Sequence, residues 1–125
     1  MSDTDYDYDI RTDVKCLPLT MIDVDAIRAG APDSWFNQPL ARINDCVLRL
    51  GVIEGEFHWH KHDREDELFY VVAGKLYVDI EDGPSVELSP NQGYLVPKGV
   101  VHRTRALERT AMLMIEGATV TATGD

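Results

Sequence analysis

Long apolar runs, closely spaced cysteines and a positive net charge are all missing from this sequence of 125 residues. No apolar stretch approaches the roughly 18 residues that a membrane span needs, so we expect no membrane partner. The two cysteines, Cys16 and Cys46, lack CxxC spacing, and we expect both to be small buried hydrophobic residues rather than zinc or redox ligands. The net charge of −10 repels phosphate backbones and disfavours nucleic acid as a partner.

Targeting and nucleotide-binding motifs are absent as well. The start, Met1 to Asp9, has neither the basic nor the apolar region of a secretory signal, which favours a cytoplasmic protein. Its alternating aspartates predict a flexible acidic tail over residues 1–12. The sequence has no GxGxxG or Walker loop and no Ser/His/Asp pattern, which disfavours hydride transfer, phosphoryl transfer and serine-nucleophile chemistry.

What is present is a pattern of short strands in a chain whose length suits one domain. Residues 13–39 are expected to form an N-terminal extension, with a short helix within Thr20 to Gly30 and a loop around Trp35 and Phe36. From Leu40 onward, short runs of β-branched and aromatic residues alternate with Gly, Pro, Asn and Asp, which predicts an all-β domain over residues 40–116 and a tail over 117–125. The expected strands are 40–44, 46–53, 56–60, 67–72, 75–80, 85–88, 93–96, 102–106 and 111–116.

Three of the four histidines lie within five residues, at His58, His60 and His62. Side chains two apart on a strand share a face, so His60 and His62 can converge on one ion. Glu67 is the last carboxylate before an apolar strand, where a divalent ion would compensate its charge, and His102 follows a turn that could bring it to the same place. Spacing alone also fits a solvated histidine-rich turn with a structural His102, and it leaves His58 and His60 as an alternative ligand pair.

The pattern as a whole resembles a known family. His60-x-His62-x(4)-Glu67-x(6)-Gly74 resembles the first cupin motif, and Pro97-x-Gly99-x-x-His102 resembles the second. The resemblance covers roughly Leu40 to Glu116. The segments 55–62, 66–69 and 96–100 are similar to single-domain bacterial cupins often labelled mannose-6-phosphate-isomerase-like, a label that describes similarity rather than a reaction.

The resemblance implies a double-stranded β-helix (jelly-roll) barrel that is commonly a homodimer. It also implies one divalent transition metal on His60, His62, Glu67 and His102, and three imidazoles with one carboxylate suit Fe, Ni, Zn, Mn or Cu. The chain departs from the motifs at three positions. Asn91 and Glu54 stand where the motifs usually open with glycine, and Ala106 stands where the second motif sometimes closes with asparagine. Asn91 can still occupy a turn position with positive φ.

Strand parity places Phe69 and Val71 on the inward face with Glu67, and Thr104 with His102. We therefore expect a mostly apolar cavity that takes a small-molecule ligand, with His58 lining it or supporting the metal ligands. The weak candidates for acid or base catalysis are Tyr70, Tyr94 and Glu56. A local basic island could meet an anionic substrate, although alternation turns Arg103 and Arg105 toward solvent or a partner subunit. The island comprises Lys98, Arg103, Arg105 and Arg109.

These features predict a metal-dependent enzyme of the isomerase, dioxygenase or lyase type that acts on a small polar metabolite in the barrel cavity. The alternative is a non-catalytic cupin that binds or senses a small ligand or sugar. The donor set serves isomerases, dioxygenases and lyases alike, so the sequence does not choose among these reactions.

Overall fold

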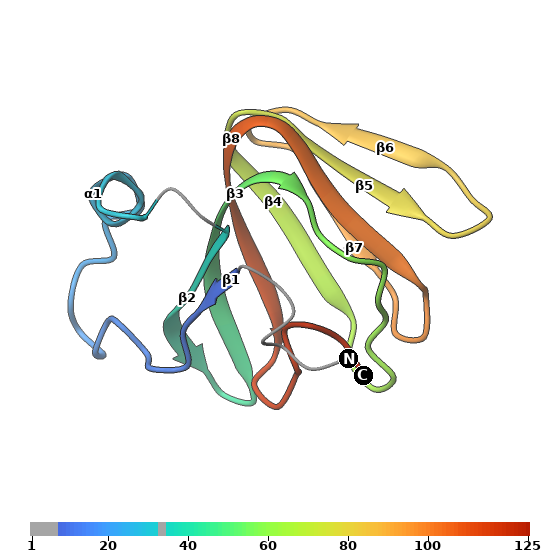
Figure 1. Ribbon diagram of the computed structural model, residues 1–125. Helices are drawn as coiled ribbons and strands as arrows, with labels where there is room; N and C mark the ends of the chain where they lie inside the picture. The colour runs from blue at the N-terminus through green and yellow to red at the C-terminus, as the bar shows by residue number, and fades with distance from the viewer. Residues whose placement is uncertain (1–7, 33–34) are drawn as a thin grey trace.

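The computed structural model describes residues 8–32 and 35–125. In chain order its elements are β1 (Tyr8–Ile10), α1 (Val24–Ala29), β2 (Trp35–Ile43), β3 (Cys46–Glu56), β4 (Glu67–Ala73), β5 (Leu76–Ile80), β6 (Ser85–Leu88), β7 (Gly93–Val96) and β8 (His102–Gly117). The strands join into one eight-stranded sheet, and the predicted all-β class is confirmed (Figure 1). No helix in the described ranges is long and apolar enough to cross a membrane.

Strand β8, 16 residues long, organises the sheet. Its first part pairs with β5, its second part pairs with β4, and β3 pairs with it through most of its length, all antiparallel. The β3–β8 register shifts between Ile53 and Gly55, and Gly55 has a φ of 95° that few other residues adopt. Because the two parts of β8 pair with different strands, the sheet bends over its own inner face (Figure 1).

Two apolar clusters lie on opposite faces of the sheet. The inner cluster includes Ile53, Phe69 and Val71. The outer cluster includes Leu50 and packs against residues of α1 and its flanks. This alternation along β3 and β4 is the two-residue period expected when both faces of a strand are covered. The members of the outer cluster are Phe36, Leu40, Leu50, Val52 and Ala111, with Ile22, Val24, Ile27 and Ala31 packed against them.

The short predicted helix is present and has defined ends. The side chain of Asp23 accepts a hydrogen bond from the backbone N–H of Ala26 at 3.1 Å, and Gly30 caps the other end. In Figure 1, α1 lies beside β2 and β3, apart from the β5–β6 hairpin. The helix therefore covers the outer face of the sheet and leaves the inner face to the strands.

The structure corrects several boundaries near the N-terminus. Of the predicted tail, residues 1–7 lie outside the described residues, but Tyr8–Ile10 form β1, which pairs in parallel with β2. The ring of Tyr8 stacks on Phe57 with centroids 4.3 Å apart, and this aromatic contact outweighs the polar composition of the segment. The predicted loop around Trp35 begins β2 instead, and the sheet starts earlier than expected.

Other expectations about the strands and cysteines also change. The predicted strand 56–60 is not formed, because β3 ends at Glu56 and His60 makes an isolated bridge to His102. The predicted strands 102–106 and 111–116 are parts of the continuous β8. The expectation of buried cysteines is wrong for Cys46, which is exposed, and Cys16 is half-buried. Cys46 directly follows the Asn44–Asp45 turn, where the chain lies at the surface.

Two turn residues show why the motif positions matter. Asn91 has a φ of 68°, so it adopts the turn conformation that we predicted for this departure from the family motif. Gly74 has a φ of 85°, and a Cβ added there would lie 2.5 Å from Thr110 Oγ1. Glycine is therefore required at 74 by both conformation and space.

Candidate functional site

The structure brings together the four residues predicted to hold a metal, here called the His/Glu cluster: His60, His62, Glu67 and His102. One ligand atom from each lies within 4.8 Å of the others. His60 and His102, distant in sequence, exchange two backbone hydrogen bonds of 2.9 and 2.8 Å, which fix their side chains next to each other. Glu67 Oε1 lies 3.2 Å from His62 Nε2 and 3.4 Å from His102 Nε2.

Backbone carbonyls orient two of the imidazoles. His60 Nδ1 lies 3.0 Å from the carbonyl oxygen of His58, and His102 Nδ1 lies 2.9 Å from that of Val100. A carbonyl only accepts hydrogen bonds, so each Nδ1 carries the proton and donates it, and each Nε2 keeps a free lone pair. This second hydrogen bond is the arrangement that usually supports metal-ligating histidines.

Polar atoms of the His/Glu cluster are buried without hydrogen-bond partners among the described residues. They are both ring nitrogens of His62, His102 Nε2 and Glu67 Oε1. Such atoms are rare in folded proteins because their lost hydration is not replaced. A divalent cation would satisfy one ring nitrogen of His62, His102 Nε2 and Glu67 Oε1 at once, and His60 completes the donor set. The residues present therefore fit a metal site.

The protonation states agree with this fit. Burial lowers the pKa of His60 to about 4, so its imidazole is neutral near pH 7. Burial acts to raise the pKa of Glu67, but the adjacent His102 and His62 outweigh it and hold the pKa below its usual range. The cluster thus offers a neutral imidazole at His60 and an ionised carboxylate at Glu67, the forms that bind cations.

A second buried pair, Glu116 and Arg49, adjoins the cluster. Glu116 is the cross-strand neighbour of Glu67, and Arg49 Nε lies 2.8 Å from Glu116 Oε1. Burial and then the charge of Glu67 raise the pKa of Glu116 to about 10. We did not predict either residue. Strand parity could have indicated Arg49, because it shares the inward face of β3 with Val47 and Gly51, which lie two residues before and after it.

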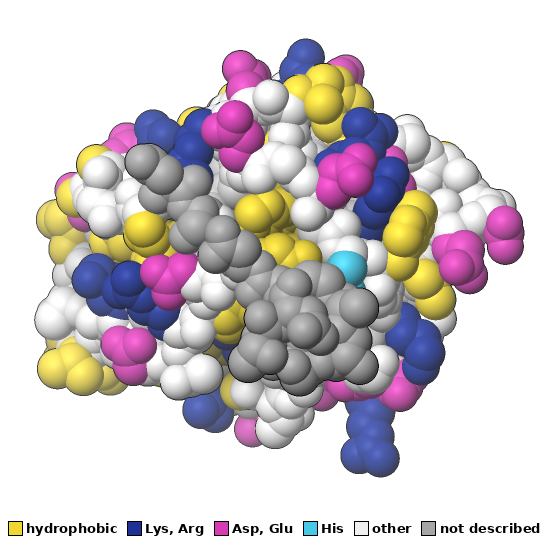
Figure 2. All heavy atoms as spheres, in the orientation of Figure 1, with side chains coloured by type: hydrophobic (Ala, Val, Ile, Leu, Met, Phe, Trp, Pro, Cys, Tyr) yellow, Lys and Arg dark blue, Asp and Glu magenta, His cyan; other side chains and the backbone are white. Residues whose placement is uncertain are grey.

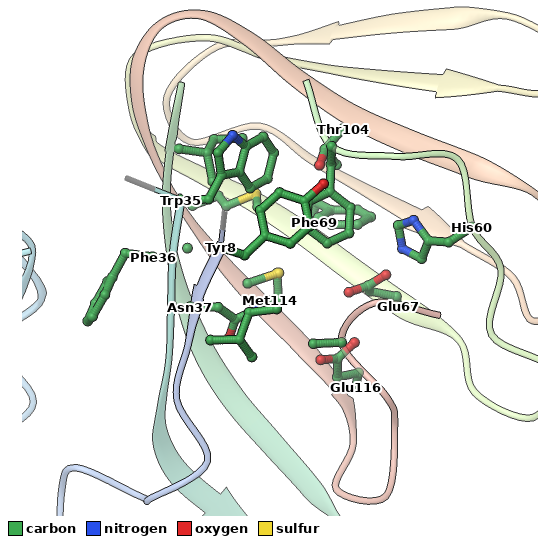
Figure 3. A pocket seen from close by; sticks show the side chains of 16 residues that line it. Tyr8, Trp35, Phe36, Asn37, His60, Glu67, Phe69, Thr104, Met114 and Glu116 are labelled. Carbon is green, nitrogen blue, oxygen red and sulfur yellow. The ribbon is translucent and has the colours of Figure 1, made fainter. Parts of the chain in front are cut away.

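A cavity adjoins the His/Glu cluster, here called the cluster cavity. Figure 3 shows the carboxyl groups of Glu67 and Glu116 and the imidazole of His60 on one side of it, with aromatic and Met side chains on the other. Asn37 Oδ1 in its lining is buried and has no hydrogen-bond partner among the described residues. Apolar walls with a few convergent polar groups are typical of small-molecule sites. The apolar lining includes Trp35, Ile53, Phe57, Phe69, Met112 and Met114.

Of the predicted lining residues, Phe69 and Thr104 line the cluster cavity. Val71 is fully buried in the inner apolar cluster and does not line it. On the face drawn in Figure 2, one histidine side chain reaches the surface beside apolar side chains. Within the His/Glu cluster, His60 is half-buried, whereas His62, Glu67 and His102 are buried.

His58 has other partners than the cluster. Its Nδ1 lies 3.1 Å from Tyr8 Oη, and its Nε2 lies 2.6 Å from the carbonyl oxygen of Thr123. With both ring nitrogens engaged, the alternative His58/His60 ligand pair loses support, and His58 does not line the cavity. Its supporting contact to the cluster is its backbone carbonyl, which orients His60.

The C-terminal segment, residues 118–125, returns to the cluster instead of extending away as a tail. The backbone N–H of Asp125 donates to the carbonyl oxygen of Lys61 at 2.9 Å, and its carboxylate accepts from the N–H of Asp63 at 2.6 Å. Gly124 approaches His60 so closely that an added Cβ would lie 2.5 Å from His60 Cβ. The last residues thus form part of the rim beside His60.

The weak acid/base candidates lie elsewhere. The Tyr70 hydroxyl donates to Asn91 Oδ1 at 3.1 Å, Tyr94 packs against the inner apolar cluster, and Glu56 lies 3.5 Å from an Arg103 terminal nitrogen. None of the three lines the cluster cavity. Side-chain alternation explains the placement of Tyr70, which follows the inward-facing Phe69.

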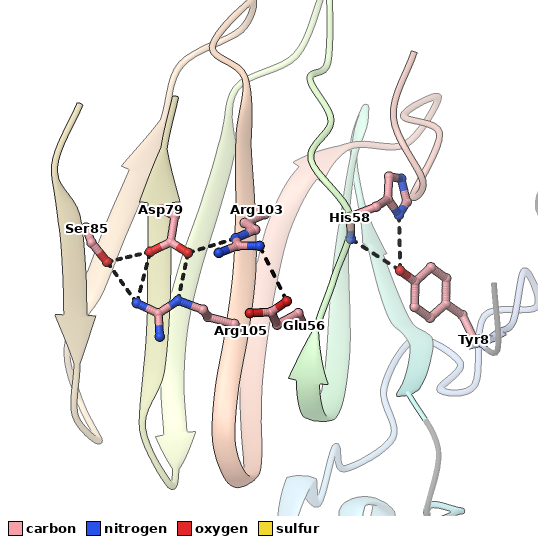
Figure 4. Close-up of polar contacts among 7 residues, drawn as sticks. All are labelled: Tyr8, Glu56, His58, Asp79, Ser85, Arg103 and Arg105. Atoms are coloured by element: carbon pink, nitrogen blue, oxygen red, sulfur yellow. Dashed lines mark hydrogen bonds and ion pairs between the residues drawn. The ribbon is translucent and has the colours of Figure 1, made fainter. Parts of the chain in front are cut away.

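The basic island does not face the cavity either. Arg103 and Arg105 lie on the outer side of β8, where both donate to Asp79, as Figure 4 shows. Arg109 donates to the carbonyl oxygen of Pro32. None of the island's four side chains lines the cluster cavity. Arg49, which is not part of the island, lies on the inner face of β3.

Comparisons with known proteins agree with the fold. A family model described as a cupin domain (Cupin_2) matches residues 48–116. The uncharacterized protein YdbB of Bacillus subtilis (strain 168) is 44% identical over 91 residues, covering 73% of this chain and 80% of YdbB. The crystal structure of a cupin-2 domain containing protein from Shewanella frigidimarina has a TM-score of 0.73 and 32% identity, covering 77% of this chain and 93% of that one. Protein NMB1881 from Neisseria meningitidis has a TM-score of 0.71 and 26% identity, covering 78% and 99%. The predicted resemblance and barrel fold are confirmed, and this chain belongs to the cupin superfamily as a small Cupin_2 domain.

Proposed function

We propose that this protein is a metal-dependent enzyme that acts on a small polar metabolite in the cluster cavity. His60, His62, Glu67 and His102 would hold one divalent transition metal. The observation that carries the proposal is the set of buried nitrogen and oxygen atoms in the cluster that make no hydrogen bond within the described part of the chain. A fold stabilised only by its core has no use for that arrangement, because each orphaned atom costs about 1–3 kcal/mol.

The chain's own residues prepare the cavity for a ligand. When bound, a metal of this class supplies Lewis acidity and, in the case of iron, oxygen activation. Asn37 Oδ1 is available to accept a hydrogen bond from a substrate hydroxyl, and Thr104 adds a second polar group. A ligand that displaced water from between the aromatic walls would strengthen these polar contacts. Isomerase, dioxygenase and lyase reactions are all compatible with this donor set.

The alternative is a cupin that binds or senses a small ligand without turnover. One observation favours it: Tyr70, Tyr94 and Glu56, our candidates for proton transfer, lie outside the cavity lining. A cavity that offers a metal and hydrogen-bond acceptors but few proton-transfer groups can capture a sugar or acid without converting it.

Metal analysis of protein purified without added metal tests the shared premise. We expect about one equivalent of a transition metal. A protein that binds none of the candidate metals, even after loading with each, would contradict the proposal. A metabolite turnover screen under air and under nitrogen then separates the classes. Oxygen consumption indicates a dioxygenase, turnover indifferent to oxygen indicates an isomerase or lyase, and tight binding without turnover indicates the sensor.

The mannose-6-phosphate-isomerase-like label and the cytoplasmic location remain predictions, and so does the homodimer. An aliphatic row of cross-strand neighbours on the outer face supports a second copy as partner, because its pairing would bury no charge. The row is Leu48, Ile115, Leu68 and Leu95, of which Leu95 is 56% exposed. Light scattering after size exclusion should give a dimer that Leu95→Glu weakens, and a wild-type monomer at high concentration would contradict it.

A further inference from the structure

A second cavity, here called the Arg49 cavity, lies between β1 and the C-terminal segment and has a volume of about 360 Å³. It shares Tyr8, Ile10 and Ala122 with the lining of the cluster cavity, so the two are neighbours. The remaining lining is Arg11, Thr12, Arg49, Val120, Thr121 and Thr123. Its lining contains two arginines, three threonines and Tyr8, so it is chemically unlike the apolar cavity next to it.

Arg49 is the unusual member of this lining, because its side chain is only 9% exposed. A guanidinium group has five N–H donors, and Arg49 directs its Nε toward Glu116. Glu116 is its one ion-pair or hydrogen-bond partner in the described part of the chain. Arg49 therefore lines the cavity with donors that no acceptor among residues 8–32 and 35–125 uses, and buried arginines normally have their donors paired.

Arg11, the other arginine of the lining, is already neutralised. It makes two hydrogen bonds to the Asp9 carboxylate, at 3.3 and 3.1 Å, and its side chain is 45% exposed. Its guanidinium also lies over the Phe36 ring at 4.9 Å. An anion entering the cavity would gain little from Arg11 and much from the less hydrated Arg49.

The charges around the two cavities also favour an anionic ligand. With a divalent ion in place, the ion and Arg49 supply three positive charges. Glu67 and Glu116 supply at most two negative charges, and the imidazoles are neutral when they ligate. The buried groups are thus positive whether or not Glu116 is ionised. An excess charge in a low-dielectric interior favours a ligand of opposite sign.

We propose that the Arg49 cavity is a carboxylate-binding subsite, and that the substrate is a small organic carboxylate that extends from Arg49 into the cluster cavity. The planar fork of one guanidinium matches one carboxylate through two parallel hydrogen bonds. Thr12 and Thr121 line the same cavity and add hydroxyl groups to it. The part of this inference that places the other end of the substrate at a metal depends on the proposed function.

The test is a titration of ¹⁵N-labelled protein followed by NMR, in metal-free and Zn²⁺-loaded forms. The probes are sodium acetate, its neutral isostere acetamide, and inorganic phosphate. In the wild type we expect acetate to shift the Arg49 Nε–H signal and the amides of Thr121 and Ala122, while acetamide leaves them unchanged. Arg49→Met should weaken acetate binding at least about tenfold, since a charge-assisted bidentate contact is lost. Arg11→Met, in the same lining, should leave it within about twofold.

Three outcomes would overturn the subsite. They are equal shifts with acetate and acetamide, unchanged acetate affinity in a folded Arg49→Met variant, or phosphate binding more tightly than acetate. If Arg49→Met fails to fold, Arg49→Lys keeps the charge and loses the fork, and its acetate affinity should fall severalfold. Zn²⁺ binding is scored separately in the same samples. A protein that binds acetate at Arg49 but no metal would refute the proposed function and leave the subsite intact.

Discussion

Charged side chains lie on both faces of the sheet around β8, but their hydrogen bonding differs. On the outer face, Asp79 accepts from Arg103 at 2.9 Å and from Arg105 at 2.7 Å, and Ser85 also donates to it (Figure 4). On the inner face, His102 Nε2 and the nearby Glu67 Oε1 have no hydrogen-bond partner in the described ranges. The comparison shows that charge alone does not mark a site. Unfilled hydrogen-bonding capacity in a buried place does.

The stacked rings strengthen the contrast. The Arg103 guanidinium lies 4.7 Å from the Trp59 ring centroid, and that of Arg105 lies 4.4 Å from the Tyr77 centroid. Each arginine thus has both a carboxylate and an aromatic partner on the outer face. This network is complete without a ligand, so we expect it to contribute to stability and not to metal binding.

The largest effect is expected for the His102→Ala variant, in which metal binding should be weakened. The variant removes an imidazole from the centre of the cluster, so metal affinity should fall more than the roughly 10- to 100-fold typical of losing a supporting residue. A competition titration with a Zn²⁺ chelator measures the change, and circular dichroism checks that the fold is kept. Affinity within about threefold of the wild type would remove His102 from the ligand set.

On the outer face, Asp79→Asn should lower the free energy of unfolding by about 2 kcal/mol, because two partly buried arginines lose their shared carboxylate. Metal affinity should stay unchanged. Urea unfolding and the same chelator titration measure the two quantities. A variant with normal stability and weakened metal binding would reverse the roles that we assign to the two faces.

The pH dependence of that variant sharpens the contrast further. Burial acts to raise the pKa of Asp79, but hydrogen bonds from Arg105, Ser85 and Arg103 outweigh it and lower the pKa to about 2. Because the folded-state pKa lies below the unfolded value, the Asp79 contribution is full above pH 3.8 and disappears as pH falls toward 2. The stability gap between wild type and Asp79→Asn should therefore shrink over that range. If urea unfolding at each pH gave a constant gap, the stabilisation would not come from the ionised Asp79 carboxylate.

The smallest effect is expected for His58→Ala. Its carbonyl oxygen, which orients His60, is retained in the variant, while the ring contacts to Tyr8 and Thr123 are lost. Metal affinity should fall less than about tenfold, measured beside His102→Ala in the same titration. Equal losses in the two variants would mean that His58 is a ligand and that the wrong histidine pair was assigned.

Much of this molecule could be predicted because its signals are local. Strand alternation and the turns at Gly74 and Asn91 depend on residues close in sequence, and the motif spacing grouped His60 with His102. The pairing of Arg49 with Glu116 could not be predicted, since it depends on the register between β3 and β8. Likewise, β1 forms through the contact of Tyr8 with Phe57, a tertiary interaction that composition does not reveal.

The position of residues 124 and 125 beside His60 and Lys61 affects how the protein should be handled. A polyhistidine affinity tag fused after Asp125 would bring extra imidazoles to the opening of the cluster. Such imidazoles could chelate nickel or zinc during purification and inflate the apparent stoichiometry. Placing a cleavable tag at the other end, or using a histidine-free tag, avoids attributing the ions of a chromatography resin to the protein.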